Sequence, residues 1–474
     1  MSGPDLLALL PLVLIAATSI VVMLAIAVAR NHTLIAGLTV VGLTGAFVSV
    51  WLVAPVAPRQ VTPLLVIDRY ALFYTALLAA AAIAVAALSH AYLHGRGIPA
   101  EELYLLLLLA TLGCVVLVAS SHFVSFFLGL EILSVSLYAM IAYLREWERP
   151  LEAGIKYLIL AAASAAFLLF GMALIYADTG TMDFARIADI AAGRANLPLL
   201  LPGTALLVTG VGFKLALVPF HLWTPDVYEG APAPVTAFVA TASKGAMFAL
   251  LVRYFYRSGS QHPGIAAVFS IIALASMFAG NLLALLQANV KRILAYSSIA
   301  HLGYLLVAFL AGGPLGLEAI SFYLVAYFIT TLGAFGVVAA LSDRGRDADD
   351  LEDYRGLFWR RPGTAVVFTA MLLSLAGIPL TAGFIGKFYV VAAGASGAKW
   401  ALVLSLVVAS AIGLYYYLRI VVMMYRRPPE GAAVRALAPA SGFVLAMLTA
   451  LLLWFGVYPT PLLNVIRAAV TMPQ

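Results

Sequence analysis

The sequence predicts an all-α integral membrane protein with about 14 transmembrane helices. Of its 474 residues, 64% are hydrophobic and only 10% are charged, and the mean hydropathy is +1.05. A soluble domain of this length would lack a polar surface with such a composition. Apolar runs of roughly 20 residues recur along the whole chain, and each is long enough to cross a ~30 Å hydrocarbon core.

Prolines, glycines and charges separate the apolar runs and order the predicted spans. The first run, 6–29, follows Asp5 without a basic segment or a clear cleavage site, so we expect a retained span rather than a signal peptide. The longest polar link, 342–363, is acidic in its middle and basic at its end, which favours a position on the membrane surface or against a partner. The other spans are expected near 34–53, 70–93, 103–120, 122–143, 153–177, 199–220, 235–257, 265–286, 293–312, 316–341, 364–391, 399–424 and 437–458.

Two of these spans are predicted to be broken. In the seventh span, Lys214 is followed by Pro219, and in the twelfth, Gly377 and Pro379 precede Lys387. A proline frees a carbonyl and kinks a helix, and paired interrupted helices are typical of transporters built from inverted repeats. We therefore expect two inverted five-helix repeats within four segments: N-terminal helices at 1–102, a first repeat at 103–260, a second at 261–425, and a C-terminal helix and tail at 426–474.

Four charged residues lie inside apolar runs: Glu131, Lys214, Lys244 and Lys387. A charge near the bilayer centre costs at least a few kcal/mol and usually has a function. A buried lysine can titrate near neutral pH, which arginine cannot, so the set predicts a path for protons or ions. The structural alternatives are a Glu131 carboxyl bonded to a neighbouring hydroxyl and lysines that extend to the interface.

His301 lies about 8 residues into the tenth span. It either relays protons between the two halves or holds two helices together by hydrogen bonds, and the sequence favours neither. Lys156 and Arg253 lie near span ends and are expected to extend to the interface, whereas Lys291 is expected to be an ordinary cytoplasmic anchor.

Several other classes of site are not indicated. Cys114 is the only cysteine and is expected to be a small buried hydrophobe, which excludes an intrachain disulfide and a cysteine-based iron–sulfur or zinc site. No P-loop and no dinucleotide fingerprint occurs in a suitable context. We therefore expect no cofactor and no metal site in this chain, and the scattered basic residues do not indicate nucleic acid as a partner.

The basic residues predict the orientation. Alternate loops, starting after the first span, hold about 14 of them, against about 8 in the other loops and the C-terminal tail. The positive-inside rule then places the first set, including 342–363, in the cytoplasm. Both termini and the loop 178–198 are expected on the outer, periplasmic side of a bacterial inner membrane.

Three long motifs resemble the antiporter-like membrane subunits of respiratory complex I, the NADH–quinone oxidoreductases. They are GFKLALVPFHLWTPDVYEGAPAPVTAFVATASKGAMF at 212–248, NVKRILAYSSIAHLGY at 289–304 and GIPLTAGFIGKF at 377–388. The motif HLWTPDVYEGAP and the lysine at position 387 resemble those of the subunit N branch of this family. Subunit M usually has a glutamate in the twelfth span. The resemblance covers nearly the whole chain.

The resemblance implies 14 helices in two inverted repeats, each with a half-channel. Glu131 would be the carboxylate of an ion pair, Lys214 its partner, Lys244 a central relay and Lys387 the lysine of the second half. The expected function is proton translocation as a subunit of NADH:quinone oxidoreductase, with other membrane and peripheral subunits as partners and with the redox centres in those subunits. The alternatives are a subunit of a multisubunit cation/proton antiporter and a structural membrane scaffold.

Overall fold

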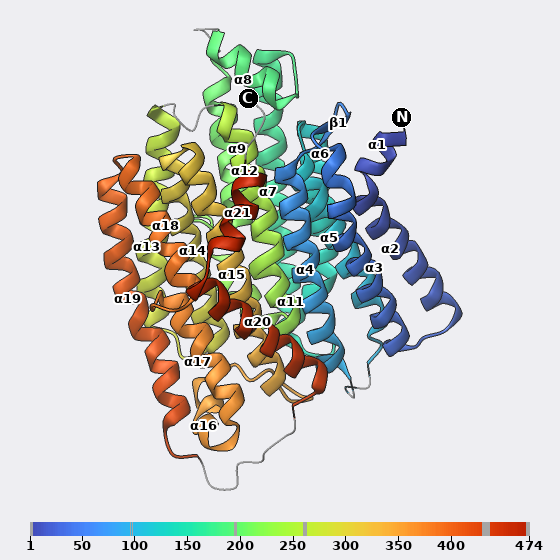
Figure 1. Ribbon diagram of the computed structural model, residues 1–474, viewed down its shortest axis with the longest axis vertical. Helices are drawn as coiled ribbons and strands as arrows, with labels where there is room; N and C mark the ends of the chain where they lie inside the picture. The colour runs from blue at the N-terminus through green and yellow to red at the C-terminus, as the bar shows by residue number, and fades with distance from the viewer. Residues whose placement is uncertain are drawn as a thin grey trace.

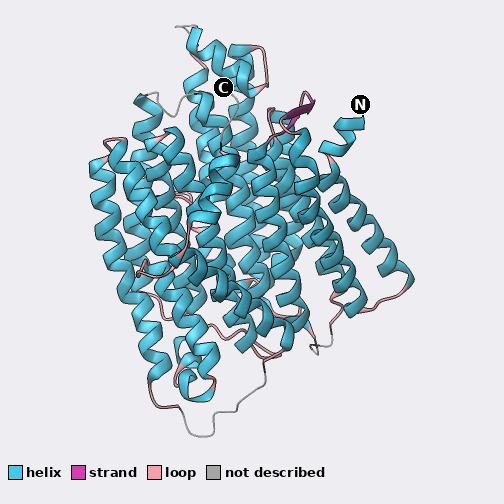
Figure 2. Ribbon diagram, viewed as in Figure 1, coloured by secondary structure: helices cyan, strands magenta, loops and turns pink. Residues whose placement is uncertain are grey.

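The computed structural model describes residues 3–94, 96, 98–193, 197–258, 263–428 and 437–470. Within these residues the chain is an all-helical integral membrane protein, in which twelve helices are long and apolar enough to cross a membrane. The helices run alongside one another, from α2 (Leu10–Val28) at one edge to α19 (Trp400–Tyr425) at the other (Figure 1). One antiparallel ribbon, β1 (Arg59–Thr62) with β2 (Leu65–Ile67), lies near the N-terminus (Figure 2).

The N-terminal helices form one edge of the bundle. The predicted first span is divided at Leu9 into α1 (Gly3–Ala8) and α2, because Pro11 begins a new helical turn there. Asp68 starts the third long helix, since its side chain accepts a hydrogen bond of 2.7 Å from the Ala71 amide. The other elements of this part are α3 (His32–Val53), η1 (Ala54–Val56) and α4 (Arg69–Leu93).

Small residues bring the helices of the first half close together. A methyl group on Gly171 would lie 2.6 Å from the Gly203 carbonyl oxygen, and one on Gly203 would lie 2.9 Å from the Gly171 oxygen. Only glycine at both positions allows α7 (Glu148–Thr179) and α9 (Leu200–Leu215) to cross at this distance. The neighbouring elements are α5 (Glu101–Ala119), which contains the buried Cys114 as predicted, α6 (Phe123–Ile141), α8 (Phe184–Gly193) and α10 (Trp223–Gly230).

The centre of the bundle is one buried span made of three consecutive elements. They are α11 (Ala233–Phe238), the π-helical turn η2 (Val239–Ser243) and α12 (Lys244–Ser258), and every residue in the apolar window of this span is buried. The helices α14 (Val290–Ala311) and α15 (Gly313–Leu341) are nearly as buried. By contrast, only 22% of the apolar window of α2 and 33% of that of α7 is buried within the bundle, as expected of helices that face lipid.

The second half surrounds this centre. In Figure 1, α20 (Pro439–Val457) crosses the front of the bundle, where it packs on α4, α15 and α18 (Ala382–Ser396). The remaining elements are α13 (Pro263–Leu285), η3 (Leu351–Tyr354), α16 (Leu357–Arg360), α17 (Pro362–Ala376) and α21 (Thr460–Ala469).

Both predicted helix breaks are present. In the predicted seventh span, 199–220, α9 ends at Leu215, and the next helix, α10, begins only at Trp223. The predicted twelfth span is divided between α17, which ends at Ala376, and α18, which begins at Ala382. The elements α1, α8 and α21 lie toward one end of the bundle and α16 lies at the other, which is the relative arrangement expected from the sequence (Figure 1). Two of the arginines used to predict orientation, Arg194 and Arg435, lie outside the described residues.

Candidate functional site

Lys214 occupies the last turn of α9, where the helix breaks. Side chains bond to backbone groups at the break. The indole of Trp223 donates at 2.9 Å to the Phe213 carbonyl oxygen, which also accepts from the Ala216 amide, and the Val218 amide donates to the Ser276 hydroxyl at 3.0 Å. Irregular backbone is tolerated at membrane depth only when its polar groups find hydrogen-bond partners within the protein. The break in this helix is therefore stabilised by specific contacts.

The Lys214 amine is held by a hydroxyl. The side chain is 5% exposed, and Nζ donates to Ser134 Oγ on α6 at 2.7 Å and lies 5.3 Å from the centre of the Tyr157 ring. Glu131 lies one turn before Ser134, close enough to Lys214 for electrostatic interaction. Its buried Oε1 has no hydrogen-bond partner among the described residues. Lys214 and Glu131 are therefore neighbours, with Ser134 as the direct partner of the amine.

Lys244 follows the π-helical turn in the central span. Such turns are rare and occur often at functional sites, because they re-aim the side chains that follow. The lysine is 1% exposed, and its Nζ donates to Ser298 Oγ on α14 at 2.7 Å. The Tyr327 hydroxyl donates to the same oxygen at 2.7 Å, and the Tyr228 ring centre lies 5.2 Å from Nζ. The lysine thus joins a hydrogen-bonded group from three helices.

His301 lies one turn after Ser298 on the same helix, with both ring nitrogens in hydrogen bonds. Nδ1 is 2.6 Å from the Tyr323 hydroxyl and Nε2 is 3.1 Å from the Tyr417 hydroxyl. A neutral imidazole donates with one nitrogen and accepts with the other, and a hydroxyl can do either. The buried ring can therefore pass a proton from one side to the other while each nitrogen keeps a partner.

Lys387 lies in α18 and bonds to the break before it. Its Nζ donates to the carbonyl oxygen of Ala376 at 2.9 Å and to Ser410 Oγ at 2.6 Å. Gly377 makes this approach possible, because it has φ +87° and a methyl group there would lie 2.8 Å from the Lys387 side chain. The broken helix therefore supplies both the room and the acceptor for the lysine.

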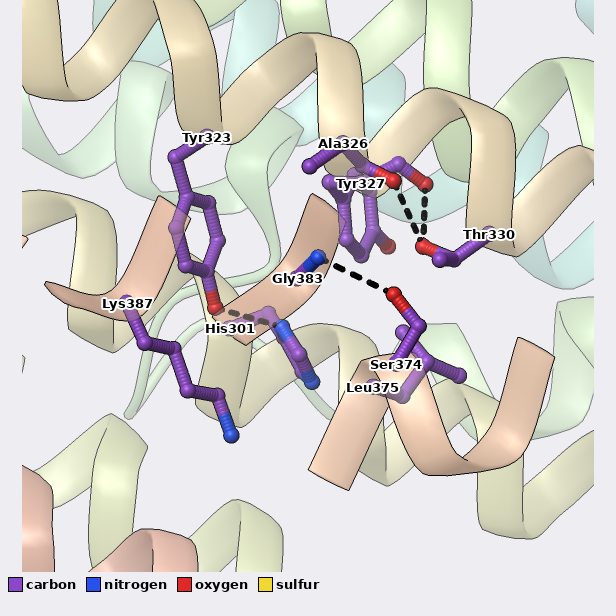
Figure 3. A pocket seen from close by; sticks show the side chains of 9 residues that line it. All are labelled: His301, Tyr323, Ala326, Tyr327, Thr330, Ser374, Leu375, Gly383 and Lys387. Carbon is purple, nitrogen blue, oxygen red and sulfur yellow. Dashed lines mark hydrogen bonds between the residues drawn. The ribbon is translucent and has the colours of Figure 1, made fainter. Parts of the chain in front are cut away.

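A narrow cavity lies between Lys387 and His301. Figure 3 shows both side chains at this cavity, together with Tyr323 and Tyr327 from α15 and Ser374 from α17. It has room for about one water molecule and is lined by several groups that can bond to it. Lys387 and His301 are close enough to interact electrostatically. The histidine and the lysine thus line one small cavity that also contains the Tyr323 and Tyr327 side chains.

The structure brings three of the five predicted residues together. Lys244, through Ser298 and Tyr327, reaches the cavity that His301 and Lys387 line. Glu131 and Lys214 form a second group in the first half. Among the described residues, no chain of direct hydrogen bonds joins Lys214 to Lys244.

Sequence reasoning missed the hydroxyl groups that hold the charged residues. A signal was available in their spacing, since Ser298 and His301, three residues apart, and Tyr323 and Tyr327, four apart, share helix faces in apolar spans. The missed residues are Ser298, Ser410, Tyr323, Tyr327 and Tyr417.

Two predictions for basic residues are wrong. The Arg253 side chain does not extend into solvent but is only 9% exposed, and it binds both oxygens of the Asp68 carboxylate at 2.8 and 2.9 Å. Lys291 is not an exposed anchor, since it is 1% exposed and donates to Asp347 at 2.7 Å. Each has a buried carboxylate from a distant part of the chain, which offsets the cost of burying its charge.

The pKa of Asp347, in the loop after α15, is lowered. Burial acts to raise it, but the ion pair with Lys291 and the hydrogen bond from the Tyr92 hydroxyl at 2.6 Å outweigh burial. In the same loop, burial raises the pKa of Asp349 despite its hydrogen bond from Asn289. The two buried carboxylates of this loop therefore have pKa values shifted in opposite directions.

Comparison with known proteins agrees with this arrangement. Residues 120–413 match the family described as the transmembrane part of NADH:quinone oxidoreductases and Mrp antiporters. The chain is 53% identical to the NADH-quinone oxidoreductase subunit N of Ectopseudomonas mendocina (strain ymp), over 99% of this chain and 97% of the relative.

Two solved structures share the fold. A chain of respiratory complex I from Thermus thermophilus matches with a TM-score of 0.84 and 33% identity, over 97% of this chain and 99% of that one. A chain of the Mrp complex from Dietzia sp. matches with a TM-score of 0.85 at 22% identity, over 99% and 97%. The chain therefore belongs to the family of NADH-quinone oxidoreductase subunit N proteins, within the wider group of complex I and Mrp antiporter membrane subunits.

Proposed function

We propose that the chain is a proton-translocating membrane subunit of an NADH–quinone oxidoreductase, with the other membrane and peripheral subunits of that complex as its partners. The observation that carries the proposal is the buried polar group that joins Lys244, His301 and Lys387 within an otherwise apolar bundle. Titratable groups at this depth are costly, and a scaffold would gain nothing from them.

In the proposed path, the proton passes from the broken helix of the first half to the broken helix of the second. Glu131 and Lys214 form the input group in the first half, Lys244 is the central relay, and Lys387 receives the proton through His301 and releases it in the second half. A positive charge that approaches a buried lysine disfavours its charged form, so each protonation promotes release by the next lysine along the path. The gap between Lys214 and Lys244, which direct hydrogen bonds do not span, would be crossed by water or by side-chain movement.

The relatives favour the respiratory complex over an antiporter. The curated relative at 53% identity is a subunit N of NADH-quinone oxidoreductase, whereas the likeness to the Mrp complex, at 22% identity, concerns the fold alone. Redox chemistry would take place in other subunits, because the single cysteine and the lack of a nucleotide-binding motif give this chain no recognisable redox ligand set. The chain itself would bind no cofactor.

The proposal includes 14 spans in two inverted five-helix repeats, at 103–260 and 261–425, after N-terminal helices at 1–102 and before a C-terminal segment at 426–474. It places both termini in the periplasm of a bacterial inner membrane. In a Cys114→Ala background, Arg186→Cys should react with an impermeant thiol reagent in intact cells and Gly345→Cys should not. Both residues are exposed; Arg186 lies in α8 and Gly345 in the segment between α15 and α16, and α8 and α16 lie at opposite ends of the bundle (Figure 1). The reverse labelling pattern would invert the orientation.

The function is tested in membranes of a strain that lacks the native copy of this chain. Expression of the wild-type chain should restore NADH oxidation that is coupled to proton uptake into inverted vesicles. The Lys244→Met chain should assemble and lose most of that uptake, because the central relay can no longer hold a proton. Sodium-driven proton exchange without NADH would instead identify an antiporter.

A further inference from the structure

Three histidines lie close together at one end of the bundle. They lie in or next to the N-terminal helices α3 and α4, which contain none of the buried lysines. His32 is the first residue of α3, His90 lies in the last turn of α4, and His94 caps the end of α4. One ring nitrogen of each lies within 4.8 Å of those of the other two. The ring centres of His32 and His90 are 4.6 Å apart, and those of His90 and His94 are 5.8 Å apart.

We propose that His32, His90 and His94 form a binding site for a divalent cation of the zinc type, although the sequence alone predicted no metal site. Imidazole suits Zn²⁺ well, and a site with three histidines and one open position is a common zinc arrangement. His90 and His94 are four residues apart, which places them on one helix face. The third ligand, His32, comes from the neighbouring helix α3, so a bound ion would connect the start of α3 to the end of α4.

The surroundings are those of a metal-binding histidine. The hydroxyl of the fully buried Tyr104 is 2.7 Å from His32 Nε2, and the Thr33 hydroxyl is 3.4 Å from His90 Nε2. A ligating histidine commonly donates its other ring N–H to such a neighbour, which fixes the tautomer and the orientation of the ring. The carboxylate of Glu101 lies close enough to His32 to interact electrostatically, and it would favour a cation.

Access to the site is open. His94 is exposed and the other two histidines are half-buried, so an ion can enter from water and keep a water molecule as its fourth ligand. The ring nitrogens need to move together by only a short distance to reach the ~2.0–2.1 Å of zinc–nitrogen bonds. Because α3 packs on both α2 and α4, a bound ion that connects α3 to α4 would stabilise this edge of the bundle.

Equilibrium dialysis with ⁶⁵Zn²⁺ tests the proposal on the full chain, extracted from membranes with its copurifying subunits through an affinity tag that lacks histidine. The wild type should bind one more zinc equivalent than the His90→Gln/His94→Gln variant, and Co²⁺ should give the intense visible absorption of a tetrahedral site. Tyr104→Phe should weaken binding by about tenfold, as loss of an orienting neighbour does in known sites.

His122→Asn is the matched control. His122 is also a partly exposed histidine, and it caps α6 through its side chain, a role that asparagine can take over. This variant should bind zinc as the wild type does. Equal zinc binding by the wild type and the double variant, or no binding by the wild type, would overturn the proposal. A fall in binding with His122→Asn as large as with the double variant would do the same.

Discussion

The amine of Lys387 donates a hydrogen bond of 2.9 Å to the carbonyl oxygen of Ala376, the residue at which α17 ends. In an unbroken helix this oxygen would accept from a backbone amide four residues later, but the chain turns away at Gly377 and Pro379. The break thus supplies a polar partner for a lysine in an apolar bundle. The helix interruption and the Lys387 side chain are therefore one structural unit.

Gly377→Ala should disturb this unit. Alanine at φ +87° is strained by about 1–2 kcal/mol, and its methyl group would also press against the Lys387 side chain. We expect a lower melting temperature of the assembled complex and a larger loss of proton pumping than of NADH oxidation. Gly363→Ala, in the first turn of α17 where a methyl group meets nothing within 4 Å, should leave both properties unchanged. If the two variants behaved alike, the turn at Gly377 would not be needed for proton pumping.

Ser298→Ala should reduce pumping through Lys244. The substitution removes the hydroxyl that accepts from the buried amine, and a hydrogen bond to a charged group contributes about 1.5–3 kcal/mol. The protonated state of Lys244 is then less favourable, so we expect roughly a tenfold slower proton uptake in inverted vesicles. Ser298→Thr should retain most of the uptake. Ser321→Ala, which removes a buried hydroxyl bonded to Tyr74 away from the lysines, serves as the control.

The buried pair of Arg253 and Asp68 is expected to matter for assembly rather than for proton transfer. Arg253→Met leaves the Asp68 carboxylate buried without its partner, which costs about 3–5 kcal/mol. We expect little assembled complex in native gels. Asp68→Leu combined with Arg253→Met should recover part of it, since no lone charge remains. Arg467→Met, which breaks an exposed ion pair with Glu318, should assemble normally. Failure of the double variant to improve on Arg253→Met would contradict this view.

Asp347 should make stability depend on pH. Its pKa in the folded protein lies below the ordinary 3.8, so its pair with Lys291 stabilises the fold fully above about pH 4 and loses this effect as the pH falls through the folded-state pKa. Asp347→Asn should therefore lower the melting temperature at pH 7, and the difference from the wild type should shrink only below pH 4. Thermal unfolding between pH 3 and pH 8 measures this, and a difference that shrinks near pH 6 would point to another group.

The sequence was sufficient for the fold class, the two helix breaks and the burial of the three lysines, because each depends on local properties. Prolines and glycines set the breaks, and continuous apolar runs favour burial. The residues with which the buried charged side chains form hydrogen bonds and ion pairs were not predictable in this way. Arg253 and its carboxylate are 185 residues apart in the chain, and Lys214 bonds to Ser134 in preference to the charged residue one turn away. Such contacts depend on how helices cross, which no span reveals alone.

Proton uptake by inverted vesicles during NADH oxidation, with Lys387→Arg in place of the wild type, tests the central claim most directly. Arginine keeps the positive charge and can still donate to the Ala376 carbonyl, but it does not release a proton at working pH. At matched amounts of assembled complex, the account predicts that the variant loses most of the protons moved per NADH. Pumping equal to that of the wild type would show that Lys387 is a fixed charge, and would contradict a path that runs through it.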